Sequence, residues 1–373
     1  MLKHARNERG LALLVAVIGL LVTGMVLSAF VVSGMMERRE ANSTLRSTQA
    51  FAIAEHGLNE TIGNWTTASW NEMAVDSSAP VSGTTAGGSG TYAGTVRRLN
   101  QELFLIDITG VDAGTRARQN LGALVKLRLL TMDIQAALTT RGPTKVGGSA
   151  EIDGTNQDPS GWTGCAADSD LAGLRLPSAG DLTTIGGCSG ASCITGSPAV
   201  DPDPAINDST FFEYGDTDWD GLVAMANKVI SPGTYTGIGP VIVSGTCMIS
   251  NSNNWGDPLT PTSACGGYFP IIYAGGNIAI NTGYGQGILL VEGDLSVQGG
   301  FEFYGIVIVK GQLKTAGTGG HFNGGVLAAN VDLDDISVLG DALVQYSSCA
   351  ITRVLQSAGT GAMLRSRGWL YSY

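Results

Sequence analysis

The chain has 373 residues, enough for two or three domains, and its 54 glycines with only 14% charged residues favour short strands joined by tight turns over a disordered chain. The net charge is −11. Lysine and arginine are spread thinly, without a basic stripe interleaved with aromatic residues, which argues against nucleic-acid binding.

The first predicted element is an apolar helix of membrane length. No charged residue occurs from Leu11 to Met36, and as a helix this segment is long enough to cross a bilayer. Lys3, Arg6 and Arg9 precede it, so the positive-inside rule predicts a cytoplasmic N-terminus and a translocated remainder. A signal peptide would have a shorter apolar core followed by a small-residue cleavage site, so we expect the segment to be retained.

Beyond the membrane the helix is predicted to continue to residue 65 as an amphipathic rod. Ala50, Ala54, Leu58 and Ile62 repeat at the spacing of one helical face, and no proline occurs before Pro80. A plain signal anchor on an exported domain is the alternative interpretation.

The residues of this region resemble a known family. Arg9-Gly10 followed by LALLVAVIGLLV, and then FAIAEHGLNETI, is similar to the N-terminus of type IV pilins and pseudopilins, and more narrowly of the PilX-type minor pilin family. The resemblance covers residues 6–62. It implies a leader, residues 1–10, which a prepilin peptidase removes between Gly10 and Leu11 before it methylates the new N-terminus.

The resemblance also implies the partners and the location of the protein. Its partners would be other pilin and minor pilin subunits, the inner-membrane assembly platform and the prepilin peptidase. The chain would be a single-pass inner-membrane protein with an extracytoplasmic C-terminal domain, and would later reach a cell-surface pilus or a pseudopilus.

One position on the predicted assembly helix departs from the major pilins. They carry a glutamate at the fifth position after the cleavage site, where this chain has Val15. A carboxylate in hydrocarbon is costly and usually functional, so its absence favours a minor subunit, either at the filament tip or in a PilX-type position that tolerates an apolar residue. Gly19 and Gly24 weaken the same helix by about 1 kcal/mol each relative to alanine.

A small antiparallel sheet is predicted within residues 77–131. A loop rich in Gly, Ser and Thr runs from about Ser77 to Gly90, and three strand-like segments follow at hairpin spacing: TYAGTVRRL, ELFLIDITGVD and RQNLGALVKLRLLT. We expect this sheet to lie against the amphipathic part of the helix.

The C-terminal half contains a short repeat. Ten-residue windows that begin at Pro240, Ile271, Ile288, Ile306 and Val326 align, with a glycine at the sixth place of the first four. Such a repeat predicts a β-solenoid, a parallel β-helix, over residues 141–355, with an irregular insertion at 155–235, a possible earlier turn at 145–154, a closing strand at 337–351 and a tail at 356–373. The expected fold is therefore α+β and mainly β.

Six cysteines follow the apolar segment, and none has the spacing of a metal site. In an exported domain an even number favours disulfides, with fifteen possible connectivities for six cysteines. Short local loops suggest the pairs Cys188–Cys193 and Cys247–Cys265. The remaining candidates are Cys165 and Cys349.

One segment, GDTDWDGLVAMANKVI, has two interpretations. Asp216, Asp218 and Asp220, followed by Gly221, resemble the first half of an EF-hand loop and make Ca²⁺ the one candidate cofactor, although Asn227 stands where a glutamate ligand belongs. The competing interpretation is a helix start, with Thr217 and Asp220 as a capping box.

We expect no catalytic residues. The chain has only three histidines, His4, His56 and His321, and no nucleophile lies near the last of them in the sequence. The densest acidic group on the repeat, Asp332, Asp334 and Asp335, is more typical of a solvated face.

Three functions are compatible with these residues. The first is a minor pilin-like subunit, which primes assembly or touches surfaces from the filament tip. The second is a pseudopilin of a type II secretion-like system. The third is a membrane-anchored, carbohydrate-active β-helix enzyme, which a groove with converging acidic and arginine side chains would favour.

Overall fold

The computed structural model of the protein describes residues 8–65, 70–71, 73–100, 102–215, 217–329, 336–364 and 369–371. The chain forms two compact units. The helix–sheet unit comprises the chain up to residue 65, residues 74–126 and the end from residue 362, and the parallel-sheet unit comprises residues 66–73 and 127–361. A long helix followed by mainly β structure makes the fold α+β, as the sequence predicts.

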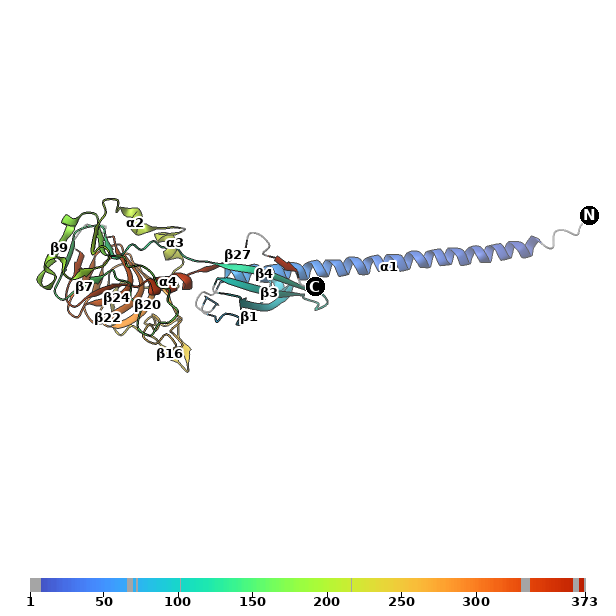
Figure 1. Ribbon diagram of the computed structural model, residues 1–373. Coiled ribbons are helices and arrows are strands. Elements are labelled where there is room, and N and C mark those ends of the chain that lie inside the picture. The colour runs from blue at the N-terminus through green and yellow to red at the C-terminus, as the bar shows by residue number, and fades with distance from the viewer. Residues whose placement is uncertain are drawn as a thin grey trace, which may run out of the picture. The chain divides into compact units, whose positions relative to one another are not determined.

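The helix–sheet unit begins with α1 (Glu8–Gly63), which Figure 1 shows as one uninterrupted helix. From residue 13 to residue 49 none of its side chains is buried. Its C-terminal part differs, because Ala50, Ile53, Ala54 and Leu58 are at most 4% exposed. Their spacing is that of one helical face, so this part of α1 is amphipathic. The predicted face also included residue 62, which is only half-buried.

The buried face of α1 packs on an antiparallel sheet. Buried and less buried positions alternate along its third strand, where Phe104, Ile106 and Ile108 are at most 1% exposed. The strands run in the order β1 (Ser78–Thr84), β2 (Gly90–Arg98), β3 (Leu103–Asp112), β4 (Arg118–Arg128), with β27 (Thr360–Met363) and β28 (Trp369–Tyr371) beside β4 and a short helix, η2 (Ala86–Gly88), before β2.

Two parts of this sheet differ from the prediction. The segment expected as a loop from residue 77 to 90 contains β1, an edge strand with no buried residue, on which Pro80 is tolerated because one side of the strand has no partner. The segment expected as a C-terminal tail supplies β27 and β28. Neither segment has the alternation of apolar and polar residues that marks a strand in a sequence.

The parallel-sheet unit contains two large parallel sheets. The strands of the first are β5 (Ala136–Thr140), β7 (Glu151–Asp153), β8 (Ala172–Leu176), β10 (Ile194–Thr195), β11 (Val200–Pro202), β14 (Lys228–Ile230), β18 (Ile271–Ala274), β20 (Gly283–Val291), β22 (Phe301–Val309), β24 (Gly320–Ala328) and β26 (Leu343–Tyr346). Those of the second are β6 (Thr144–Gly147), β9 (Leu182–Ile185), β15 (Gly233–Tyr235), β19 (Ile278–Ile280), β21 (Leu295–Val297), β23 (Leu313–Thr315) and β25 (Ile336–Val338).

Short elements fill the connections of this unit. They are η3 (Ala179–Asp181), η4 (Gly186–Ala191), α2 (Asp208–Phe212), α3 (Trp219–Ala224) and α4 (Ser348–Ser357), with the hairpins β12 (Glu213–Tyr214) to β13 (Thr217–Asp218) and β16 (Ile242–Val243) to β17 (Thr246–Cys247). The segment expected as one closing strand at 337–351 therefore divides into the end of β25, β26 and the first turn of α4. Ser347 caps this helix by accepting a hydrogen bond from the backbone N–H of Ala350.

Successive turns of the chain stack in register. The structure confirms the alignment of Ile271 with Ile288 and of Ile288 with Ile306. The predicted alignment of Ile306 with Val326 is wrong by one residue, because Ile306 pairs with Gly325. The window at Pro240 is wrong: its residues form the antiparallel hairpin β16–β17, and the strand that pairs with β18 is β14.

The order of the turns in the stack differs from their order in the sequence. The first turn (β5, β6, β7) lies in the middle, and the chain continues outward through β8 and β9 before it returns from the other end through β14, β18, β20, β22 and β24. Residues 155–235, expected as an irregular insertion, thus supply strands at both ends. The last turn (β24, β25, β26) pairs in parallel with the first.

A row of glycines turns the chain at one corner of the stack. Gly287, Gly305 and Gly324 share one register position and have φ angles of 119°, 137° and 144°. A Cβ atom on Gly305 would lie 2.2 Å from the carbonyl oxygen of Gly287. The chain can bend at this position, and the strands of neighbouring turns can still pair, only if the residue there is glycine.

Candidate functional site

The exposed half of α1 is a candidate interaction surface of the helix–sheet unit. Val15 is 60% exposed, and a Cβ atom on Gly19 or Gly24 would have no neighbour within 4 Å. The hydroxyl of Thr23 donates to the carbonyl oxygen of Gly19 at 2.8 Å, so a polar group within the apolar segment is satisfied by the helix itself. In its described residues the chain has one helix that is long and apolar enough to cross a membrane.

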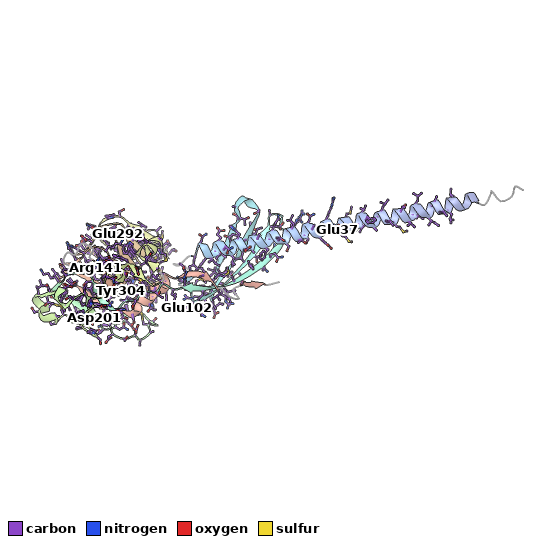
Figure 2. The ribbon with its side chains drawn as sticks, turned by 90° about the horizontal axis from the view of Figure 1, so that it is seen from above. Glu37, Glu102, Arg141, Asp201, Glu292 and Tyr304 are labelled. Carbon is purple, nitrogen blue, oxygen red and sulfur yellow. A yellow bond between two sulfur atoms is a disulfide. The ribbon has the colours of Figure 1, made fainter. Side chains whose placement is uncertain are left out.

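The residues of the predicted leader site lie at the start of this helix. Gly10 and Leu11 belong to the first turn of α1, and residues 1–7 of the leader lie outside the described residues. Figure 2 shows the side chain of Glu37, the first charged residue after the apolar segment, projecting from α1.

The C-terminal half of α1 is joined to its sheet by small residues and one polar contact. Gly57 lies against the ring of Tyr92, where a Cβ atom would be 2.5 Å from the ring. The hydroxyl of Tyr92 donates to Glu60 Oε2 at 2.9 Å. Burial and this carboxylate both raise the pKa of Tyr92. The hydrogen bond between Tyr92 and Glu60 joins β2 to α1 next to the contact between Gly57 and the Tyr92 ring.

The parallel-sheet unit has a groove of about 810 Å³ on which carboxylates converge. Figure 2 labels one of them, Glu292. Its side chain accepts hydrogen bonds from Trp219 Nε1 at 3.2 Å and from Lys310 Nζ at 2.8 Å, and the Lys310 amine lies 4.5 Å from the centre of the Trp219 ring. The groove is lined by Phe212, Glu213, Asp218, Trp219, Asp220, Asn277, Glu292, Gly293, Asp294, Lys310 and Gly311.

Most of the polar groups in this groove support the fold. Asp294 Oδ1 accepts a hydrogen bond from the backbone N–H of Gln312 at 2.8 Å, and Asn277 Oδ1 accepts one from that of Asp294 at 2.9 Å. These bonds link successive turns of the stack. Trp219 is only 5% exposed, so its ring face is not available to stack on a sugar. Among the residues that the structure describes, the lining contains neither arginine nor histidine.

The candidate calcium residues form the start of a helix. Asp218, not Thr217 as predicted, is the N-cap of α3, and its Oδ1 accepts a hydrogen bond from the backbone N–H of Gly221 at 2.8 Å. Asp220 lies in the first turn, where its charge favours the helix dipole. Asp216 lies outside the described residues, and so do Asp332, Asp334 and Asp335.

One other group of metal-ligand type occurs in the described part of the chain. Asp158, Cys165 and Cys349 place their ligand atoms within 4.8 Å of one another. The two sulfur atoms are joined in a disulfide, which removes the thiolates that a metal would need.

All six cysteines are paired. The disulfides are Cys165–Cys349, Cys188–Cys193 and Cys247–Cys265, with sequence separations of 184, 5 and 18 residues. The two short pairs are those suggested by local loop closure. The long pair joins segments that no sequence pattern connects, because only the stacking of the turns brings them together.

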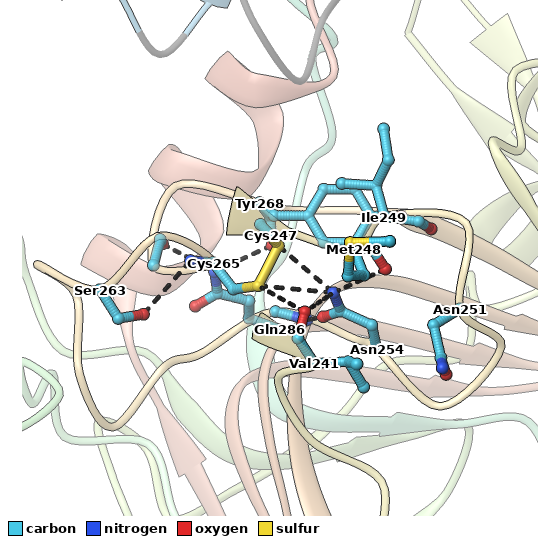
Figure 3. Close-up of a disulfide and its surroundings, with 12 residues drawn as sticks. Val241, Cys247, Met248, Ile249, Asn251, Asn254, Ser263, Cys265, Tyr268 and Gln286 are labelled. Carbon is cyan, nitrogen blue, oxygen red and sulfur yellow. Dashed lines mark hydrogen bonds between the residues drawn. A yellow bond between two sulfur atoms is a disulfide. The ribbon is translucent and has the colours of Figure 1, made fainter. Parts of the chain in front are cut away.

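The Cys247–Cys265 disulfide lies in a polar network shown in Figure 3. Asn254 is fully buried and donates from Nδ2 to the carbonyl oxygen of Met248 at 3.0 Å. Gln286 Nε2 donates to the carbonyl oxygen of Tyr268 at 2.9 Å. The loop that follows β15 is thus fixed onto β20, although it has no regular structure beyond one hairpin.

Comparison with known proteins gives little. No family model matches the chain, and no curated protein matches it. A crystal structure of the competence-associated pilin ComZ from Thermus thermophilus is similar over 88% of this chain and 97% of that chain, with 12% sequence identity and a TM-score of 0.24. A similarity of this size does not establish a shared fold or function.

Proposed function

We propose that the protein is a minor pilin-like subunit of a type IV pilus or a related filament. The observation that carries this proposal is the division of α1 into two halves: an exposed, uncharged apolar half and an amphipathic half packed on an antiparallel sheet. An exposed apolar helix of this length requires a bilayer or a bundle of like helices around it. A membrane anchor that later packs into a filament core meets both requirements.

In this proposal residues 1–10 are a leader, and cleavage between Gly10 and Leu11 followed by methylation gives the mature subunit. The test is expression with a prepilin peptidase, followed by intact mass measurement and N-terminal sequencing. We expect a start at Leu11 with one added methyl group. A chain that keeps Met1 in the presence of active peptidase would overturn the proposal and leave a membrane-anchored protein.

The subunit would act in assembly priming or in surface contact at the tip. Val15 supports this role, because a subunit without a carboxylate at this position has no group there to pair with a neighbour's N-terminus. We propose that the parallel-sheet unit is a β-solenoid displayed by the filament, as its in-register parallel strands suggest. Its bulk disfavours repeated packing along a shaft. Deletion of the gene should lower pilus number or adhesion.

The same helix serves equally well in a pseudopilus, which is our alternative within this class. The two are distinguished by the phenotype of a deletion strain: loss of secreted cargo with normal pili indicates a pseudopilin, and loss of pili or adhesion indicates a pilus subunit. Both versions keep the leader, the membrane segment and the lateral packing of α1.

An enzyme remains the second candidate because of the carboxylate-lined groove in the parallel-sheet unit. Paired carboxylates can hydrolyse glycosides when one is an acid and the other a base or nucleophile. The test is release of reducing ends from a panel of polysaccharides by the purified chain and by Glu292→Gln. Release that the substitution abolishes would establish the enzyme, whereas no release from any polymer favours the pilin-like role.

A further inference from the structure

A cavity lined by arginines lies beside α1, just beyond its apolar half. Its volume is about 240 Å³, and it is lined by Arg39, Asn42, Ser43, Arg46, Arg116 and Ala117. Three guanidinium groups, an amide and a hydroxyl can all donate hydrogen bonds into it, and no carboxylate is among the lining residues. In a chain with a net charge of −11, such a concentration of donors favours an anion.

The three guanidinium groups come from two elements that are held together. Arg39 and Arg46 are seven positions apart on α1, about two helical turns, and therefore lie on one face. Arg116 lies in the turn between β3 and β4. Next to Arg46, Ser47 Oγ accepts a hydrogen bond from Gln119 Nε2 at 2.7 Å, which fixes the start of β4 to the helix. The two elements that carry the arginines are thus held together without a ligand.

The carboxylates nearby neutralise this cluster only in part. Glu37 precedes Arg39 by two positions and lies about 200° away around the helix, and Glu40 follows Arg39 by one position and lies about 100° away. Asp112 lines an adjoining pocket of about 670 Å³ together with Arg46 and Arg116. Its Oδ1 already accepts hydrogen bonds from the backbone N–H groups of Arg116 and Ala117, both at 2.8 Å. These bonds, aided by the charge of Arg46, lower the pKa of Asp112 and keep it ionised within its own turn.

Among the described residues, none of the three arginines takes part in an ion pair within 4 Å. The charge of Asp112 offsets part of that of Arg46, and the remaining positive charge is left for solvent ions or a ligand from outside the chain. Arg46 is half-buried, while Arg39 and Arg116 are exposed at the rim, so the cluster is open to an approaching group.

The position of the cluster along α1 indicates the source of the anion. The helix rises about 45 Å between Arg9 and Arg39, which matches the thickness of about 40–45 Å of a bilayer with its headgroups. If Arg9 lies in one headgroup layer, Arg39 lies in the other. Arg46 and Arg116 then stand just above the same layer, from which arginine side chains can reach down to the phosphates.

We propose that Arg39, Arg46 and Arg116 bind the phosphate group of an anionic phospholipid in the leaflet from which α1 emerges. Guanidinium groups bind phosphate oxygens in a bidentate manner, and three of them around one small cavity favour a single phosphate. The bound lipid holds the subunit at one depth and one rotation in the membrane, and it is released when the subunit leaves for the filament. This inference rests on the proposed membrane insertion of α1.

The test uses the full chain in nanodiscs of mixed phosphatidylcholine and phosphatidylglycerol. Native mass spectrometry after release measures which lipids stay bound, for the unchanged chain and for R39Q/R46Q/R116Q. The matched control is R97Q/K126Q/R128Q, which removes the same charge from exposed positions of β2 and β4. We expect the first variant to retain phosphatidylglycerol about tenfold less well, and the control to change it less than twofold.

Each other result has a definite meaning. Equal retention by both variants, or a preference for inorganic phosphate over phosphatidylglycerol in competition, would overturn the lipid site. If an alkaline carbonate wash strips the unchanged chain from vesicles, then membrane insertion and the proposed function fail instead. Thermal unfolding checks that R39Q/R46Q/R116Q is folded. The single variant R116Q, at an exposed turn, repeats the measurement with the least risk to the helix.

Discussion

A Cβ atom on Gly110 would lie 2.3 Å from the carbonyl oxygen of Ala50, so β3 and α1 touch backbone to backbone at this point. Because a backbone carbonyl cannot rotate away as a side chain can, any larger residue must push the helix from the sheet. This contact sets the distance between the C-terminal half of α1 and its sheet.

Gly110→Ala should therefore lower the free energy of unfolding by about 1–3 kcal/mol. Thermal unfolding of the full chain in detergent, followed by circular dichroism, measures the loss. Gly34→Ala is the matched control: it has open space around it and lies in the helix, where alanine should stabilise. Equal melting temperatures for the two variants would show that the contact is not tight.

Gly305→Ala should lower the free energy of unfolding by at least as much as Gly110→Ala. The residue combines a φ angle of 137° with a backbone oxygen at 2.2 Å from the added carbon, so the strained conformation and the clash act together. Gly300, five positions earlier, has no neighbour within 4 Å of an added carbon and serves as the control. We expect the melting temperature of Gly300→Ala to change little. A Gly305→Ala chain as stable as the control would show that this position does not require glycine.

The three disulfides should differ in their contribution to stability. In the loop-closure model, Cys165–Cys349 with its separation of 184 residues contributes about 5 kcal/mol, and Cys188–Cys193 with a separation of 5 contributes about 2 kcal/mol. Replacing each pair by serines and comparing urea midpoints tests this order. A larger loss from the short pair would mean that local strain or residual structure in the unfolded chain outweighs loop entropy.

Alkaline pH should destabilise the parallel-sheet unit through its buried tyrosines. Burial raises the pKa of Tyr268 to about 12, from about 10 in the unfolded chain. Since the folded state holds this proton more tightly, its contribution is complete below pH 10 and is lost as the pH rises through 12. The melting temperature of Tyr268→Phe should therefore fall less between pH 9 and pH 11.5 than that of the unchanged chain. An equal fall for the two chains would contradict this contribution of Tyr268.

The sequence predicts those parts of the fold in which a periodic pattern reports burial. The face of α1 at Ala50, Ala54 and Leu58 and the alignment of Ile271, Ile288 and Ile306 are of this kind. The edge strand β1 escapes prediction because it buries nothing. The window at Pro240 is misplaced because a glycine-rich hairpin has the same composition as a turn of the stack.

The candidate sites are less accessible from the sequence. The arginine cavity joins α1 to a turn some seventy residues later, and only the packing of α1 on its sheet, with the hydrogen bond from Gln119 to Ser47 beside the cavity, brings these parts together. The carboxylate groove gathers residues at equivalent places of three turns of the stack, which the repeat spacing relates, and residues of the segment from Phe212 to Asp220, which no spacing relates to the repeat. Asp218 is a helix cap because its side chain accepts a hydrogen bond from a backbone N–H group. From the Asp-rich sequence alone, a helix cap and a calcium ligand cannot be distinguished.

The pairing of the last turn with the first has a consequence for how the chain folds. Residues 136–153 cannot complete their hydrogen bonding until residues 320–346 have been synthesised, so the middle of the stack is the last part to be completed. Such distant pairing slows folding and leaves strand edges exposed in the meantime. If the chain is exported as it is made, as the proposed function implies, this unit crosses the membrane open. The Cys165–Cys349 bond can then form only once Cys349 has crossed, so it marks a late stage in the completion of the stack.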